Sequence, residues 1–203
     1  MSDDPALEPR IIVVTGIQAA GKTTVARLLA QRFERGVHIE ADALQKMIVS
    51  GGEWVSEPGV MSPGAARQLG LRLDNACLLA RSFFEAGFTV VVDDIIIGER
   101  WRHLKSALKG VPFTLVVLAP KVEVVVPERD RNRGKRTLGE DWAHYLDREL
   151  RETMTRIGVW IDNSAQTPDE TMDEILRRLP PGELTGKPTA SPAPPDSRRG
   201  RRV

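Results

Sequence analysis

The chain has 203 residues, with 29 lysines and arginines against 28 aspartates and glutamates, and 41% of its residues are hydrophobic. This composition is typical of one soluble globular domain, and no apolar run approaches the roughly 20 residues needed to cross a bilayer. Residues 180–203 carry five basic and two acidic side chains, so the rest of the chain is slightly acidic. That balance argues against a protein built mainly to bind nucleic acid.

The two ends of the chain differ in composition from its middle. Residues 1–9 form a short extension without the layout of a signal peptide. Residues 180–203 hold six of the fourteen prolines and few apolar side chains, which predicts a disordered tail. Only the arginines of that tail suggest contact with nucleic acid. The single cysteine, Cys77, excludes an intrachain disulfide and favours a reducing, cytoplasmic location. We therefore expect one folded domain over residues 10–179.

Short apolar runs alternate with longer helical patterns between these ends. This alternation predicts an α/β fold, a three-layer sandwich with helices on both faces of a five-stranded parallel sheet. Ser62 and Pro63 predict the start of a long helix that ends at Gly87, and Thr167 begins a capping box for the last helix. The predicted strands are Ile11–Val14, Val37–Ile39, Thr89–Val92, Phe113–Leu118 and Val159–Ile161.

The first predicted strand runs directly into a glycine-rich loop. Residues 16–23 read Gly-Ile-Gln-Ala-Ala-Gly-Lys-Thr, which matches the G-x-x-x-x-G-K-[ST] pattern of a P-loop, and a helical pattern follows. In such a loop the backbone amides and the helix N-terminus bind the phosphates of ATP or GTP. The Thr23 hydroxyl would also bind Mg²⁺, which prefers oxygen ligands. The residues expected at the phosphates are Gly16, Ala19, Ala20, Gly21, Lys22, Thr23 and Thr24.

An aspartate follows the second predicted strand at the same edge of the sheet. Asp42 could face the γ-phosphate and accept the proton of an acceptor hydroxyl during phosphoryl transfer. Asp42 is also a good N-cap for a helix predicted over Ala43–Val49. Both interpretations stay open, because one aspartate can serve either role.

Two adjacent carboxylates end the third predicted strand. Asp93 and Asp94 follow an apolar run, as in a Walker B element, where a carboxylate orients Mg²⁺ or its water ligands. Because side chains alternate along a strand, we expect one of the two to face the metal or the acceptor and the other to face a neighbouring amide. The pattern leaves open which residue has which role.

An arginine-rich segment comes after the fourth predicted strand. Arg129 and Arg133 are four residues apart, on one face of a helix, and Arg136 lies three residues further on. In a lid over residues 127–141, one arginine would stack on the adenine and another would neutralise the transferring phosphoryl group. A solvated helix face with salt bridges is the alternative, and the neighbouring P-loop favours the lid.

Two more residues are candidates for contact with the acceptor. Trp54 lies in a glycine-rich loop that could form the apolar wall of an acceptor pocket, although ordinary packing would also explain it. Arg100, near the start of a predicted helix, could bind a phosphate of the acceptor if the substrate is a nucleotide. A solvated helix charge is an equal alternative for Arg100.

Together these motifs resemble those of the chloramphenicol phosphotransferase-like branch of small P-loop kinases. The resemblance spans about residues 10–178 and rests on the P-loop, Asp42, Val-Val-Asp-Asp at 91–94, Glu-Arg-Trp-Arg at 99–102 and the arginine spacing. It implies the fold of nucleotide and shikimate kinases and transfer of the ATP γ-phosphate to a hydroxyl. It also implies that Asp42 is the general base, that Arg133 is the lid arginine, and that the loop with Gln166 and Thr167 borders the adenine.

The expected function is therefore an ATP- and Mg²⁺-dependent phosphotransferase with an antibiotic-like, sugar-like or nucleoside hydroxyl as acceptor. The alternatives are a nucleotide or polynucleotide 5′-hydroxyl kinase, and a P-loop ATPase switch that gates a partner. The residues predicted to carry the reaction are Lys22, Asp42 and Arg133, and those predicted to bind the nucleotide include Arg129, Arg133, Gln166 and Thr167. The predicted metal ligands are Thr23, Asp93 and Asp94. The residues predicted to contact the acceptor are Asp42, Trp54, Asp94 and Arg100.

Overall fold

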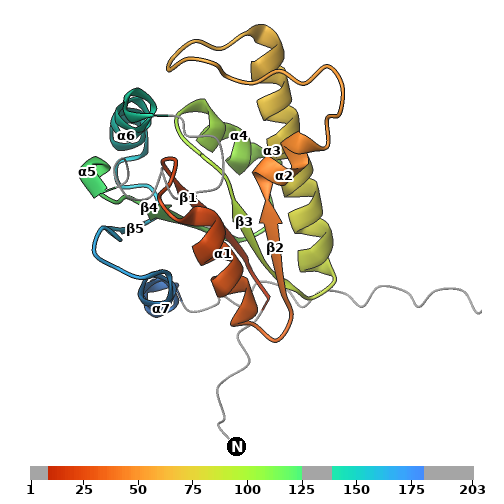
Figure 1. Cartoon of the computed structure of the whole chain (residues 1–203). Helices are drawn as coiled ribbons and strands as arrows, with labels where there is room; N and C mark the ends of the chain where they lie inside the picture. The colour runs from red at the N-terminus through yellow and green to blue at the C-terminus, as the bar shows by residue number, and fades with distance from the viewer. Residues whose placement is uncertain (1–8, 125–138, 181–203) are drawn as a thin grey trace, which may run out of the picture.

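The computed structural model describes residues 9–124 and 139–180. Within these residues a five-stranded, all-parallel sheet with strand order β2-β3-β1-β4-β5 is flanked by helices, as Figure 1 shows. This confirms the predicted three-layer α/β sandwich. Most of the predicted lid, with Arg129, Arg133 and Arg136, and the proline-rich tail lie outside the described residues.

The elements follow the alternation of strand and helix that the sequence predicts. The strands are β1 Ile11–Gly16, β2 Gly36–Glu40, β3 Thr89–Asp93, β4 Phe113–Leu118 and β5 Val159–Ile161. The helices are α1 Lys22–Gln31, α2 Ala41–Lys46, α3 Pro63–Glu85, α4 Glu99–Ala107, α5 Val122–Val124, α6 Glu140–Met154 and α7 Pro168–Arg178. All five predicted strands are confirmed, with bounds that differ by two residues or fewer.

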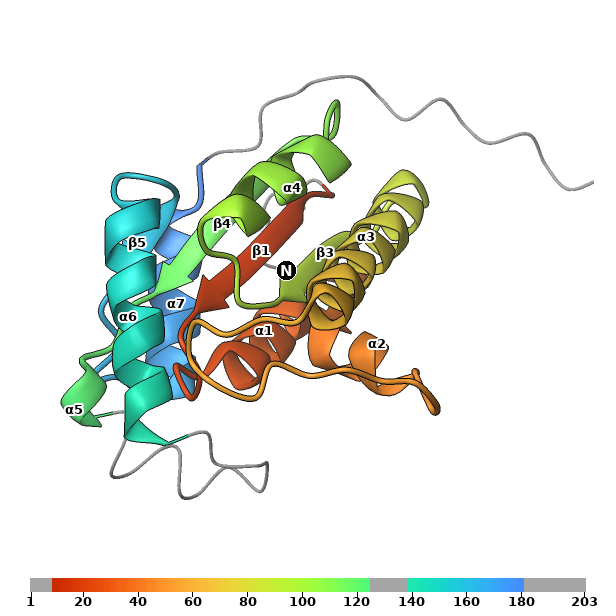
Figure 2. The same ribbon diagram turned by 90° about the horizontal axis from the view of Figure 1, so that it is seen from above.

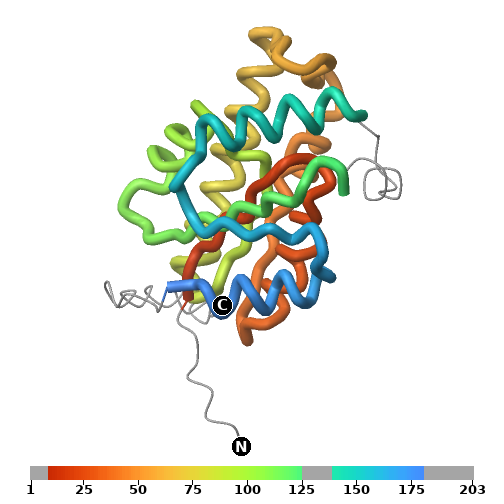
Figure 3. The backbone as a smooth tube through the Cα atoms, turned by 90° about the vertical axis from the view of Figure 1, so that its left-hand side faces the viewer, coloured from red at the N-terminus to blue at the C-terminus, as the bar shows by residue number. Residues whose placement is uncertain are grey.

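Helices cover both faces of the sheet. The helices α1 and α7 pack against each other, as do α3 and α4. Figure 2 shows α1 and α4 on opposite sides of β1, and Figure 3 shows α7 (blue) and α6 (teal) on opposite sides of the strands. Because both faces are covered, β1 and β3 are buried along their whole length, which explains their continuous apolar sequences. None of the described helices is long and apolar enough to span a membrane.

Two helix starts have the caps that the sequence predicts. The Ser62 hydroxyl accepts the amide of Ala65 at 3.0 Å, with Pro63 at the first helical position. The Thr167 side chain accepts the amide of Glu170 at 3.2 Å, and the Glu170 carboxylate accepts the amide of Thr167 at 2.8 Å. This is the predicted capping box, and it begins α7.

The helix after β2 begins earlier than the sequence suggested. Its first residue is Ala41 and its N-cap is Glu40, the last residue of β2, so the predicted helix over Ala43–Val49 is wrong in its bounds. The chain passes from strand to helix with no intervening loop. Asp42 therefore lies inside the first turn of α2, and the interpretation of Asp42 as an N-cap is also wrong.

The register of the sheet brings the ends of its strands together. Val14 of β1 pairs with Asp93 of β3, and Glu40 of β2 pairs with Asp93 from the other side. Because all strands are parallel, the residues that follow β1, β2 and β3 meet at one edge of the sheet. The segment between α2 and α3 also lies at this end of the molecule (Figure 1).

Candidate active site

The P-loop joins the end of β1 to the start of α1. Gly16 has a φ of 148°, and a Cβ placed on it would lie 2.3 Å from the carbonyl oxygen of Leu118, so only glycine fits where β1 and β4 end side by side. Gly21 has a φ of 91° and precedes α1 as its N-cap. The first turn of α1 contains no acidic side chain, so the positive potential at its N-terminus is available to an anion.

One contact within the loop and contacts with two other segments hold it in place. The Lys22 ammonium donates to the carbonyl of Ile17 at 2.7 Å across the loop. The Asn163 side-chain amide, which follows β5, donates to the carbonyl of Ala20 at 2.9 Å, and buried Gln18 donates to the carbonyl of Gly139 at 3.0 Å. Sequence reasoning missed Gln18 and Asn163 as loop supports, because their partners are more than 100 residues away.

A hydroxyl and a carboxylate meet at the start of α1. The Thr23 hydroxyl donates to Asp93 Oδ1 at 3.1 Å, and the second oxygen of Asp93 lies 2.6 Å from His38 Nε2. Asp93 is buried, with 4% of its surface exposed. Mg²⁺ prefers oxygen ligands, and the Thr23 hydroxyl and the Asp93 carboxylate supply such oxygens beside the N-terminus of α1. These two residues therefore fit that ion.

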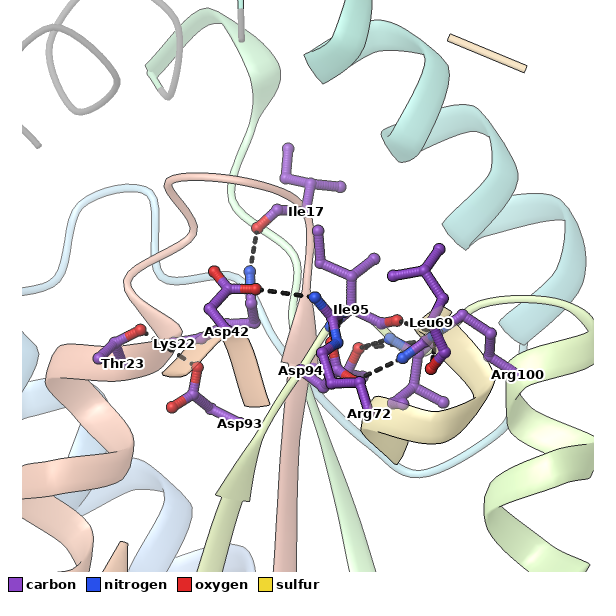
Figure 4. A network of polar contacts seen from close by, with 12 residues as sticks. Ile17, Lys22, Thr23, Asp42, Leu69, Arg72, Asp93, Asp94, Ile95 and Arg100 are labelled. Carbon is purple, nitrogen blue, oxygen red and sulfur yellow. Dashed lines mark hydrogen bonds and ion pairs between the residues drawn. The ribbon is translucent and has the colours of Figure 1, made fainter. Parts of the chain in front are cut away.

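The neighbouring carboxylate, Asp94, has different partners (Figure 4). Its Oδ1 accepts the Arg72 guanidinium and the amide of Ile95, and its Oδ2 accepts Arg100 at 2.5 Å. The contact with the Ile95 amide is the kind of contact that strand alternation predicts for one of the two aspartates. With both oxygens occupied and only 1% of the side chain exposed, Asp94 is a poor metal ligand, which corrects its proposed role at the metal and at the acceptor.

Arg100 is part of the same cluster and bonds to groups of the protein. Besides Asp94, it donates to the carbonyls of Ile95 at 2.8 Å and Leu69 at 3.1 Å. Burial lowers the pKa of the Arg100 guanidinium, and the charge of Asp94 opposes that shift. Its three nitrogens are therefore engaged within the protein, which corrects the expectation that Arg100 binds a phosphate of the acceptor.

Asp42 lies at the edge of this cluster and is open to solvent. Arg72 NH1 donates to Asp42 Oδ1 at 3.0 Å, and 47% of the Asp42 side chain is exposed. Asp42 follows β2 and Thr23 is the last residue of the P-loop, so both lie at the edge of the sheet where the strands end. A carboxylate in this position is available to a molecule that binds beside the phosphates.

Sequence reasoning missed Arg72, which connects Asp42 to Asp94. The available signal was an arginine on the apolar face of α3, between Leu69 and Leu73. A buried arginine in such a stripe needs anionic partners, and here they come from α2 and from the end of β3. The pattern shows that a partner is needed, but it does not show which carboxylate provides it.

The remaining candidate residues are placed apart from this cluster. Gln166 pairs with Glu174 at 2.5 Å and with Thr171 at 3.1 Å, and Thr167 caps α7, so both side chains are engaged within α7. Trp54 is 54% exposed, and Val60 and Met61 are also exposed, so the segment between α2 and α3 does not close an apolar wall in this structure.

The fold, the P-loop and the carboxylates at the strand ends define a P-loop kinase. Residues 9–180 match the chloramphenicol phosphotransferase-like protein family, and the chain belongs to that family. This confirms the resemblance drawn from the motifs.

Known relatives and structures agree with this class. A Pyrococcus furiosus protein named "Putative adenylate kinase" is 29% identical over 180 residues, which is 85% of each chain. A sugar kinase from Janibacter sp. HTCC2649 has a TM-score of 0.62 at 18% identity, over 83% of this chain and 93% of that one. The Deinococcus radiodurans tunicamycin resistance protein has a TM-score of 0.58 at 24% identity, over 83% of this chain and 94% of that one. These two structures show the fold alone.

Proposed function

We propose that the protein transfers the γ-phosphate of ATP to a hydroxyl of an uncharged small molecule, with Mg²⁺ as the metal. The observation that carries this proposal is Asp42: a carboxylate that is half-exposed, held on one oxygen by Arg72, and located at the sheet edge that the P-loop also occupies. A carboxylate that is open to solvent beside phosphate-binding groups can accept the proton of a hydroxyl.

The nucleotide would bind to the P-loop. The amides of residues 16–21 and the N-terminus of α1 would bind the phosphates, with Lys22 at the β- and γ-phosphates and Thr24 at the α-phosphate. Thr23 and Asp93 would hold Mg²⁺, which neutralises phosphate charge when it is bound. The kinase domain would span residues 10–179. Its lid would consist of residues 127–141, with Arg129 and Arg133, which lie outside the described residues, closing over the nucleotide.

In the proposed reaction Asp42 takes one proton. The acceptor oxygen forms a bond to the γ-phosphorus as the bond to the bridging oxygen of ADP breaks, and ADP leaves with that electron pair. The proton of the acceptor hydroxyl passes to Asp42. Lys22 offsets the negative charge that develops on the phosphoryl oxygens. In this proposal Asp42 has to lie within hydrogen-bond reach of the acceptor oxygen.

The charges around Asp42 support an uncharged acceptor over a nucleotide. Buried Arg72 and half-buried Arg100 belong to the charge cluster around Asp42 in the described part of the chain, and both are engaged by carboxylates. An acceptor that carries its own phosphate needs arginines that are available to it. A sugar-like, nucleoside or antibiotic-like acceptor carries no phosphate and does not need such arginines.

The test is ADP release from ATP and Mg²⁺ across a panel of acceptors: sugars, nucleosides, hydroxylated antibiotics, AMP and 5′-hydroxyl oligonucleotides. We expect stimulation by one uncharged class and a loss of at least about 100-fold in Asp42→Asn. Asp74→Asn is the matched control, because it removes a carboxylate of α3 that pairs with His103 of α4.

Each other outcome of this panel contradicts a defined part of the proposal. Stimulation by AMP alone would establish a nucleotide kinase, as the name of the Pyrococcus relative suggests for that protein. Nucleotide binding with no stimulation by any acceptor would favour a P-loop switch. Turnover that survives Asp42→Asn unchanged would exclude Asp42 as the base.

A further inference from the structure

A buried arginine links the exposed carboxylate of the site to the interior. Only 7% of the Arg72 side chain is exposed, yet its NH1 reaches Asp42 and its NH2 reaches Asp94. Its third nitrogen, Nε, is buried and has no hydrogen-bond partner in the described part of the chain. The polar contacts that orient this side chain are therefore the two carboxylates, one on each terminal nitrogen.

Asp94 is the buried partner of Arg72. It is 1% exposed and accepts the amide of Ile95 at 2.7 Å, so the backbone after β3 fixes its orientation. Its second oxygen accepts Arg100, which in turn donates to the carbonyls of Leu69 and Ile95. Leu69 lies on α3, the helix that carries Arg72. Asp94 and Arg100 thus tie the cluster to the backbone of α3 and of the segment after β3 (Figure 4).

The charges of the cluster balance. Asp42 and Asp94 supply two negative charges, and Arg72 and Arg100 supply two positive charges. Asp94 and Arg72 are buried and Arg100 is half-buried, and an unbalanced charge is costly in such surroundings. An arginine suits the central position because its planar guanidinium presents two terminal nitrogens in a fixed fork, whereas a lysine has a single nitrogen.

We propose that Arg72 is a positioning residue that holds the Asp42 carboxylate in its reactive orientation, and that Asp94 and Arg100 hold Arg72. This inference rests on the proposed role of Asp42 as the base. With Oδ1 bound by Arg72, Asp42 presents Oδ2 to the acceptor hydroxyl. Arg72, Asp94 and Arg100 thereby set the orientation of Asp42 without contacting the substrates themselves.

The test compares Arg72→Lys with Arg81→Lys. Arg81 also lies on α3 and donates to backbone carbonyls of Ala107 and Lys109, so its variant measures the loss of a purely structural arginine. We expect Arg72→Lys to lower kcat by about 10- to 100-fold, because small misplacements of a catalytic group have effects of that size. The KM for ATP should stay within about twofold, because the P-loop is intact. Arg81→Lys should leave kcat unchanged.

A double variant separates positioning from general structural damage. If Arg72 acts through Asp42, then Arg72→Lys should lower kcat by less than about twofold in an Asp42→Asn background. Rates are to be normalised to folded protein by circular dichroism and urea titration. If Arg72→Lys does not fold, Arg100→Lys takes its place in the same cycle, with a smaller expected loss because Arg72 keeps both carboxylates.

The outcomes distinguish this inference from the proposed function. An inactive Asp42→Asn together with a fully active Arg72→Lys would overturn the positioning role and leave Asp42 as the base. Equal losses from Arg72→Lys in both backgrounds would also overturn it, because the effect would not pass through Asp42. A fully active Asp42→Asn would exclude Asp42 as the base, and with it the premise of this inference.

Discussion

The Thr23 hydroxyl donates to the Asp93 carboxylate at 3.1 Å, across a separation of 70 residues in the chain. Thr23 lies in the first turn of α1 and Asp93 ends β3, and they meet because β1 and β3 are adjacent parallel strands. The second oxygen of Asp93 faces His38 of β2 at 2.6 Å. Asp93 therefore joins the P-loop to two strands, and of the two aspartates at the end of β3 it is the one that contacts the P-loop threonine.

Asp93→Asn should weaken the use of Mg²⁺. The amide keeps the size of the side chain but removes the charge that orients Thr23 and the metal. We expect the Mg²⁺ concentration for half-maximal turnover to rise by about tenfold or more, as is usual when a partner of a metal ligand is removed. The measurement is initial rate against Mg²⁺ at fixed ATP, with Asp74→Asn as control. An unchanged Mg²⁺ requirement would assign the metal to other groups.

Asn163→Ala should destabilise both the fold and the nucleotide site. The Asn163 amide donates to the carbonyl of Ala20 inside the P-loop, in a buried environment. Its loss should cost about 1–3 kcal/mol in the free energy of unfolding and raise the KM for ATP. Urea titration and steady-state kinetics measure the two effects, with exposed Asn75→Ala as control. Lower stability with an unchanged KM would show that the loop keeps its shape without Asn163.

Thr167→Ala should act on stability alone. The Thr167 hydroxyl caps α7 by accepting the amide of Glu170. Removing such a cap costs about 1 kcal/mol in the free energy of unfolding, which urea titration would measure. Because the hydroxyl is engaged in the cap, we expect the KM for ATP to change by less than about twofold. A several-fold rise in KM would instead support the predicted contact between this residue and the nucleotide.

Cys77 should be inert in the folded protein. Burial, reinforced by the charge of Asp74, raises the pKa of the Cys77 thiol from 9.0 to about 12. Because the thiolate is the reactive form, Ellman's reagent at pH 8 should label no thiol before unfolding and one per chain in denaturant. Rapid labelling of the native protein would contradict this burial.

The same shift of the Cys77 pKa predicts a dependence of stability on pH. The folded state keeps the thiol neutral and the unfolded state releases its proton more easily, so ionisation favours unfolding. The contribution of Cys77 to stability is complete below pH 9.0 and is lost as the pH rises towards about 12. Urea titrations of the wild-type protein and Cys77→Ala between pH 8 and pH 11 should show a smaller alkaline loss in the variant.

Local patterns in the sequence determined the fold class and the phosphate site. The strand-loop-helix pattern around residues 16–23, the five apolar runs and the caps at Ser62 and Thr167 depend on residues close together in the chain. Glycine conformation, helix capping and strand burial are local properties, so a linear pattern carries them. The bounds of α2 are the exception, since Glu40 caps a helix that begins with no loop after β2.

Only the tertiary structure decided the roles of the charged residues. The sequence placed Asp93 and Asp94 at a strand end but could not divide them between the phosphate site and the arginines, since their partners lie on β2, α1, α3 and α4. The role of Arg72 likewise depends on its contact with Asp42, which lies 30 residues earlier in the chain. A buried charge is compensated by whichever opposite charge the packed elements bring within reach, and that proximity exists only once the sheet and helices have assembled.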